Sequence, residues 1–187
     1  MGTKLNVIAC KLIAQRHSYA GWGMSTRRST SFLHVTKSFR TQGIMKLLGA
    51  RLLMMRRGLV ELSIRNRPTL SQQDGFVHAG VLATILDSAG GYAVLSLLPH
   101  GSRVLTVEFK INFTRPAIGH VVRARGRVRK LGKRIAVCEL EARTRQSGKW
   151  MSCAWGSQTV YCIRPNYGKT ETTPSKSSRM RNNIVRV

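Results

Sequence analysis

The period of apolar and polar positions changes along the chain from about residue 41 onward. Over residues 44–55 apolar side chains recur at roughly helical spacing, which predicts a short helix that Gly58 ends. Residues 60–64 then alternate strictly between apolar and polar, as a strand with one buried face does. The segment 69–78 is polar, and we expect a loop there.

The stretch 79–98 is apolar on nearly all sides, and Asp87 is its only charged residue. Its length is enough to cross a bilayer, but Thr, Ser and Gly residues interrupt it and strand-like sequence follows directly. A helix that is apolar all round and does not span a membrane must be enclosed by protein. We therefore expect a buried helix covered by a sheet.

Four further strands follow this helix. Their apolar and polar residues alternate with a period of two over residues 105–113, 122–129, 135–144 and 150–162. The first is expected to bury its odd-numbered apolar residues, from Leu105 to Phe113. The order of elements predicts an α+β fold in which a curved antiparallel sheet wraps around one long helix.

Charge is concentrated at the two ends of the chain. The 187 residues include 32 Lys and Arg against 7 Asp and Glu, a formal net charge of +25, which favours a polyanionic partner. Residues 1–60 hold no acidic residue at all. We therefore expect a basic N-terminal extension over 1–40, disordered or targeting, a folded domain over 41–163, and a basic tail over 164–187. With 42% hydrophobic residues, the middle part should fold.

The four cysteines form no C-x-x-C pair and no metal-ligand spacing with histidine. Reduced thiols in a cytoplasmic compartment, with no metal and no cofactor, are the expectation. An acid-free leader that contains Arg and Ser leaves a mitochondrial transit peptide, and hence the matrix, as an alternative.

Several segments together resemble one known family, the hotdog-fold acyl-CoA thioesterases, and within it the phenylacetate-pathway-like branch. The residues that carry the resemblance are Gln72, Gln73, Asp74, Gly75, Phe76, Val77, His78, Ala79 and Gly80, then Asp87, Gly90 and Gly91, the strand 105–113, and Arg115, Pro116 and Ala117. The resemblance implies hydrolysis of a medium-chain, long-chain or aromatic acyl-CoA. It also implies a homodimer, or a dimer of dimers, with a continuous sheet and shared active sites.

Asp87 is the expected catalytic carboxylate. A lone acid in an apolar helix is unfavourable unless it is protonated, paired with another group or required for function. The resemblance aligns Asp87 with the family's catalytic acid. It would act as a nucleophile or as a general base toward water. The alternative is a buried acid that bonds to nearby backbone.

The start of the long helix is the expected oxyanion site. Free N–H groups of a first helical turn, here near Ala79 and Gly80, bind anions. Ala79 stands at a position where the family's usual His-Gly-Gly pattern has a glycine. His78 would line the site, or it would only cap the helix. Gln72 would orient water or the thioester, or only bond its own loop. Thr106 would lie near the attacking water.

Helix geometry separates these two halves of the site. Ala79 and Asp87 are eight residues apart, so their backbones lie about 12 Å apart along a straight helix. One reacting carbonyl cannot touch both. The sequence therefore predicts a site that combines the helix start of one subunit with Asp87 of its partner.

Candidates for contact with coenzyme A phosphates are Arg115, Lys133 and Arg134, although a solvated basic turn would look the same. A competing class is a non-catalytic hotdog protein that binds acyl-CoA, or binds nucleic acid through its basic tails and the arginines at alternate positions of the strand 122–129. No helix-turn-helix or RNA-binding aromatic motif is evident, so nucleic acid is disfavoured.

Overall fold

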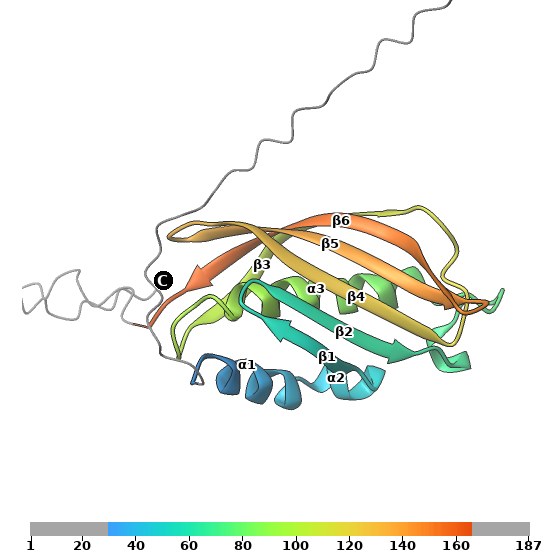
Figure 1. Ribbon diagram of the computed structural model, residues 1–187, viewed down its shortest axis with the longest axis horizontal. Coiled ribbons are helices and arrows are strands. Elements are labelled where there is room, and N and C mark those ends of the chain that lie inside the picture. Colours follow the sequence, from blue (N-terminus) through green and yellow to red (C-terminus); the bar gives the residue numbers. More distant parts are fainter. Residues whose placement is uncertain (1–29, 166–187) are drawn as a thin grey trace, which may run out of the picture.

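The computed structural model describes residues 30–165, and the two extensions expected from the sequence lie mostly outside this range (Figure 1). The elements in chain order are α1 (Thr30–Thr41), α2 (Gly43–Leu48), β1 (Arg51–Arg56), β2 (Leu59–Arg65), the 3-10 turn η1 (Pro68–Leu70), α3 (Ala79–Leu95), β3 (Arg103–Phe113), β4 (Val121–Leu131), β5 (Ile135–Gln146) and β6 (Lys149–Ile163).

One antiparallel sheet holds the six strands of residues 30–165, in the order β1-β2-β4-β5-β6-β3. The sheet curves around α3, which lies along its concave face (Figure 1). On that face the side chains of Ala124, Leu140 and Val160 are fully buried, as are Ile85 and Leu86 of α3. The predicted α+β architecture is therefore confirmed.

The prediction of a helix over 44–55 is wrong for the second half of that range. The chain leaves α2 at Gly49, whose φ of 62° is left-handed, and continues as β1. β1 pairs with β2 through a tight turn at Gly58. A short apolar run fits a helix or a strand equally well, and here pairing with β2 decides the outcome.

Helix α1 is part of the packed domain, although it lies almost wholly before residue 41. Val35 is fully buried and Phe39 is 9% exposed. The Phe39 ring meets Tyr92 of α3 edge to face, with ring centroids 5.7 Å apart. The folded unit therefore begins before the boundary that the charge distribution suggested, since α1 packs on α3.

Strand β3 does not follow the simple alternation expected for it. The register shifts between Thr106 and Glu108, so a bulge changes which side chains face α3. Before the bulge Thr106 lies on that face, and after it Phe109 and Ile111 do, opposite Gln158 and Gly156 of β6. β3 is an edge strand, and Leu105, Val107, Phe109 and Phe113 are between 43% and 61% exposed.

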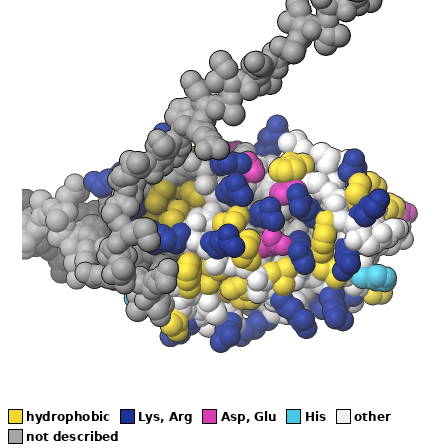
Figure 2. Space-filling model, in the orientation of Figure 1, with side chains coloured by type: hydrophobic (Ala, Val, Ile, Leu, Met, Phe, Trp, Pro, Cys, Tyr) yellow, Lys and Arg dark blue, Asp and Glu magenta, His cyan; other side chains and the backbone are white. Residues whose placement is uncertain are grey.

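The arginine face of β4 carries its own counter-charges. Arg123 and Arg125 both pair with Glu61 of β2, at 3.4 and 3.0 Å, and Arg129 pairs with Glu139 of β5. Figure 2 shows acidic side chains among the basic ones on the outer face of the sheet. This arrangement weakens the case for a polyanion bound to that face, because neighbouring glutamates already neutralise much of the arginine charge.

Within residues 30–165 we find no helix long and apolar enough to cross a membrane.

Candidate active site

Asp87 lies on the side of α3 that faces β3 and β6. Its Oδ1 accepts a hydrogen bond from Thr106 Oγ1 at 2.6 Å and another from Gln158 Nε2 at 2.7 Å. Gln158 Nε2 also donates to Thr106 Oγ1 at 3.0 Å and to the Asp87 carbonyl at 3.1 Å. Within the described residues no hydrogen bond reaches Oδ2. The carboxylate is therefore oriented through one oxygen while the other is left to react.

Gln158 is a candidate site residue that the sequence interpretation missed. It is 1% exposed, and its Oε1 has no hydrogen-bond partner in the part of the chain described. Gly90 makes room for it, since a Cβ at that position would overlap the Gln158 amide. The sequence feature that could have indicated Gln158 is a polar residue at an inward position of β6, between Gly156 and Val160.

The start of α3 presents one free backbone donor. His78 is the N-cap residue, and its Nδ1 accepts the Gly80 N–H at 3.0 Å. This is the capping role that we considered as the alternative for His78, and it removes the Gly80 N–H from any oxyanion site. The Ala79 N–H has no acceptor within residues 30–165. His78 and Ala79 are both exposed.

Gln72 lies in the loop before α3. Its N–H donates to the Phe76 carbonyl at 2.8 Å, and its carbonyl accepts from Gly75 N–H at 3.0 Å. Gly75 has a φ of 79°, which closes this turn. The backbone of Gln72 is thus used by the loop, while its half-buried side chain makes no hydrogen bond to the described residues.

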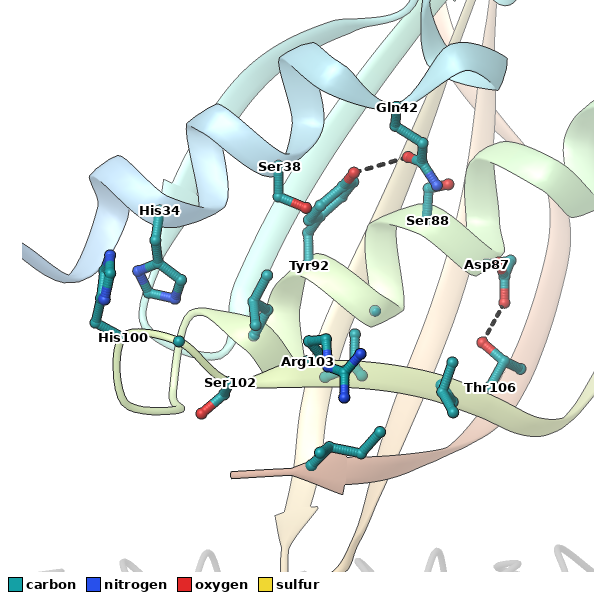
Figure 3. Close-up of a pocket in the computed structure, with 16 residues that line it drawn as sticks. His34, Ser38, Gln42, Asp87, Ser88, Tyr92, His100, Ser102, Arg103 and Thr106 are labelled. Atoms are coloured by element: carbon teal, nitrogen blue, oxygen red, sulfur yellow. Dashed lines mark hydrogen bonds between the residues drawn. The ribbon is translucent and has the colours of Figure 1, made fainter. Parts of the chain in front are cut away.

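A cavity of about 490 Å³ opens beside Asp87, between α1, α3 and β3 (Figure 3). Thr106 lines it with Asp87, whereas Gln72, His78 and Ala79 do not. A single subunit therefore unites Asp87 with Thr106 and Gln158, and leaves the helix start apart from them. This matches the separation expected along α3.

The three basic candidates do not meet within one subunit. Arg115 is exposed just after β3 ends, whereas Lys133 and Arg134 lie in the turn from β4 to β5. The strand register places that turn at the end of the sheet where β3 begins. Lys133 and Arg134 line a surface hollow there, together with Lys130.

The buried thiols are poor alternatives to Asp87 as nucleophiles. Burial raises the pKa of Cys138 to about 12 and that of Cys153 to about 11. It also raises the pKa of Cys162. All three therefore stay protonated at neutral pH. Among residues 30–165 no group of His, Cys, Asp and Glu side chains could hold a metal ion.

Comparisons with known proteins point to one family. Residues 74–151 match the model of the thioesterase superfamily. The chain is 38% identical to a thioesterase family protein of Silicibacter pomeroyi, over 72% of this chain and 99% of that one, with a TM-score of 0.71. It is 32% identical to a Halobacterium salinarum protein named "Putative esterase", over 54% of this chain and 70% of the relative.

The chain belongs to the thioesterase superfamily and has its hotdog fold. The PaaI protein of the Escherichia coli phenylacetic acid degradation operon shares this fold. It has a TM-score of 0.64, over 71% of this chain and 93% of that one. At 22% identity, this second likeness concerns the fold alone.

Proposed function

We propose that this protein is an acyl-CoA thioesterase, which hydrolyses the thioester of a medium-chain, long-chain or aromatic acyl-CoA to the free acid and coenzyme A. The observation that carries the proposal is the Asp87 carboxylate. Thr106 and Gln158 hold one of its oxygens at the edge of a cavity large enough for an acyl group. Membership of the thioesterase superfamily supports the same reaction.

Asp87 would act at the carbonyl carbon, directly or through water. As a general base it takes a proton from water while the water oxygen attacks; as a nucleophile its own oxygen attacks, and water then opens the resulting anhydride. In both routes the C–S bond breaks and the sulfur of coenzyme A leaves and takes up a proton. The Ala79 N–H, at the positive end of α3, would stabilise the negative charge on the carbonyl oxygen.

The exposed apolar edge of the sheet supports a homodimer. Among the described strands, β3 is unpaired on one side, and it carries Leu105, Val107, Phe109 and Phe113 in exposed positions. Long apolar edge strands are usually covered in a native assembly. Pairing of β3 with β3 of a second copy would cover this edge. In our proposal it also brings the Ala79 end of one α3 toward Asp87 of the other; two such dimers could associate further.

Mixed dimers test the shared site directly. Gln72→Ala and Asp87→Asn each inactivate both sites of their own homodimer, but a heterodimer of the two keeps one site with neither change. We therefore expect mixtures to regain up to about half of the wild-type rate per heterodimer, as symmetry requires. Thiol release would be measured on heterodimers purified with two different affinity tags. Verified heterodimers that stay inactive would contradict a site built from two subunits.

Coenzyme A would lie with its phosphates near Lys133 and Arg134 or near Arg115. Because these groups sit at opposite ends of the sheet, a single subunit offers only one of them to a given thioester. Lys and Arg side chains bind phosphate well, and Arg does so with two parallel hydrogen bonds.

The decisive assay is release of free thiol from a panel of acyl-CoA thioesters. We expect turnover of at least one panel member by the wild-type protein. The alternative function is binding without catalysis, of acyl-CoA or of nucleic acid, and the charge of +25 is the observation that favours the latter. Absence of turnover together with salt-dependent binding of DNA or RNA would replace our proposal with that alternative.

A further inference from the structure

The cavity beside Asp87 changes in character from one end to the other. Asp87 and Thr106 stand at one end, and His34 of α1 and His100 stand at the other, while the exposed Arg103 at the start of β3 lies between them in the view of Figure 3. Among the described residues that line it, Asp87 is the only acidic one and Arg103 is the only arginine. The end away from the reacting centre is therefore rich in groups that donate hydrogen bonds.

The wall supplied by α1 is held in place by hydrogen bonds and packing. Tyr92 donates its hydroxyl proton to Gln42 Oε1 at 2.7 Å, and Phe39 packs against the Tyr92 ring. Burial raises the pKa of Tyr92, an effect that a hydrogen bond with Ser38 partly offsets, so this phenol stays neutral and keeps its proton. In the middle of the cavity, the Tyr92 hydroxyl thus already has hydrogen-bond partners.

The far end, by contrast, has polar atoms without partners. Both ring nitrogens of His34 and the hydroxyl of Ser102 are buried and have no hydrogen bond within the described residues. Ser102 is 8% exposed. The His34 and His100 rings meet edge to face, with centroids 5.6 Å apart. Arg103 makes no ion pair with any described residue. Buried polar atoms without partners are unfavourable, so this arrangement suits a ligand that supplies acceptors.

A hydrocarbon chain in this cavity would leave those polar atoms without hydrogen-bond partners. A carboxylate has two acceptor oxygens and a negative charge, which suit the Arg103 guanidinium and an imidazole N–H. From this we infer that the preferred substrates are thioesters whose acyl group ends in a second carboxylate, which is bound by Arg103 with His34 and His100. The inference rests on the proposed thioesterase function and specifies its substrate class.

The dimensions of α3 are compatible with two negative charges in one cavity. Asp87 and Leu95 both line it, and eight residues of helix span about 12 Å. Repulsion between two negative charges falls with distance, and the positive charge of the Arg103 guanidinium, which also lines the cavity, offsets it. A shorter acyl group would leave its carboxylate too close to Asp87 and out of reach of the histidines.

Matched pairs of substrates test the inference. Each pair has the same number of carbons and ends in a methyl or a carboxylate group: butanoyl and succinyl, hexanoyl and adipoyl, octanoyl and suberyl, decanoyl and sebacyl-CoA. We expect kcat/KM of the wild-type protein to be about tenfold or more higher for the carboxylate member at one of the longer lengths, because a charged hydrogen-bonded pair contributes at least that much. Arg103→Met should reduce this preference about tenfold.

The control is Arg127→Met, which removes the same charge from an exposed position of β4 outside the cavity. It should leave the preference unchanged. Affinity of the Asp87→Asn protein for the same pairs, measured by calorimetry, gives a readout independent of turnover. Hydrolysis of methyl-ended substrates at equal or higher kcat/KM, at every length, would overturn the carboxylate inference and leave the thioesterase proposal standing. No turnover of any thioester would overturn both.

Discussion

Asp87→Asn is expected to lower kcat for thioester hydrolysis by about 10²–10⁴-fold, the usual contribution of a positioned acid or base. Asparagine has nearly the same shape, and its carbonyl oxygen can still accept from Thr106 and Gln158, which now bond Asp87 Oδ1 at 2.6 and 2.7 Å. The fold should therefore survive. What is lost is the negative charge, and with it both base strength and nucleophilicity. Thiol release under saturating substrate gives kcat, and thermal unfolding checks the fold.

Glu139→Gln provides the matched control. It makes the same change from carboxylate to amide on the outer face of the sheet, where Glu139 pairs with Arg129. An exposed ion pair of this kind contributes about 0–1 kcal/mol, so we expect kcat and the unfolding temperature to stay near wild-type values. If Asp87→Asn turned over substrate as fast as this control, the carboxylate would have no chemical role and another group would have to activate water.

The main elements and Asp87 could be predicted because each leaves a strong local signal. Alternation with a period of two marks β2, β4, β5 and β6, and a single charge in an apolar run marks Asp87. β1 could not be assigned because its short apolar run fits either period. α1 was missed because its buried stripe is narrow: among its side chains from residue 32 onward, Val35 and Phe39 are the ones in the core, and a helix needs a wider apolar face to stand out.

The arrangement around Asp87 depends on tertiary contacts that no local pattern contains. Thr106 was a candidate from the resemblance, yet simple alternation would have turned it away from α3. The bulge before Glu108 places Thr106 on the face toward α3 instead, because one extra residue exchanges the two faces of a strand. Gln158 is far from Asp87 in sequence and meets it only because the β6 register and the space at Gly90 allow the amide to reach α3.

Gly126→Ala is expected to destabilise the protein strongly, because the added methyl group would overlap backbone atoms of α3. A Cβ at this position of β4 would lie 2.5 Å from the Ala89 carbonyl oxygen and 2.5 Å from the Gly90 amide nitrogen. Both are backbone atoms of α3, so no side chain can rotate away and the helix must move off the sheet. Overpacking a core usually lowers the free energy of unfolding by about 1–3 kcal/mol, and we expect about 3 kcal/mol or more here.

Gly43→Ala separates this packing effect from the general effect of adding a methyl group. No atom lies within 4 Å of a Cβ at Gly43, and the residue is helical, so the change should be neutral or stabilise the protein by up to about 1 kcal/mol. Urea unfolding of both variants gives the comparison. Because α3 carries Asp87 while Thr106 and Gln158 stand on the sheet, a displaced helix also lengthens their hydrogen bonds. Gly126→Ala should therefore lose hydrolysis even at temperatures where it remains folded. Wild-type stability and turnover in Gly126→Ala would mean that α3 can shift against β4 without disturbing the site.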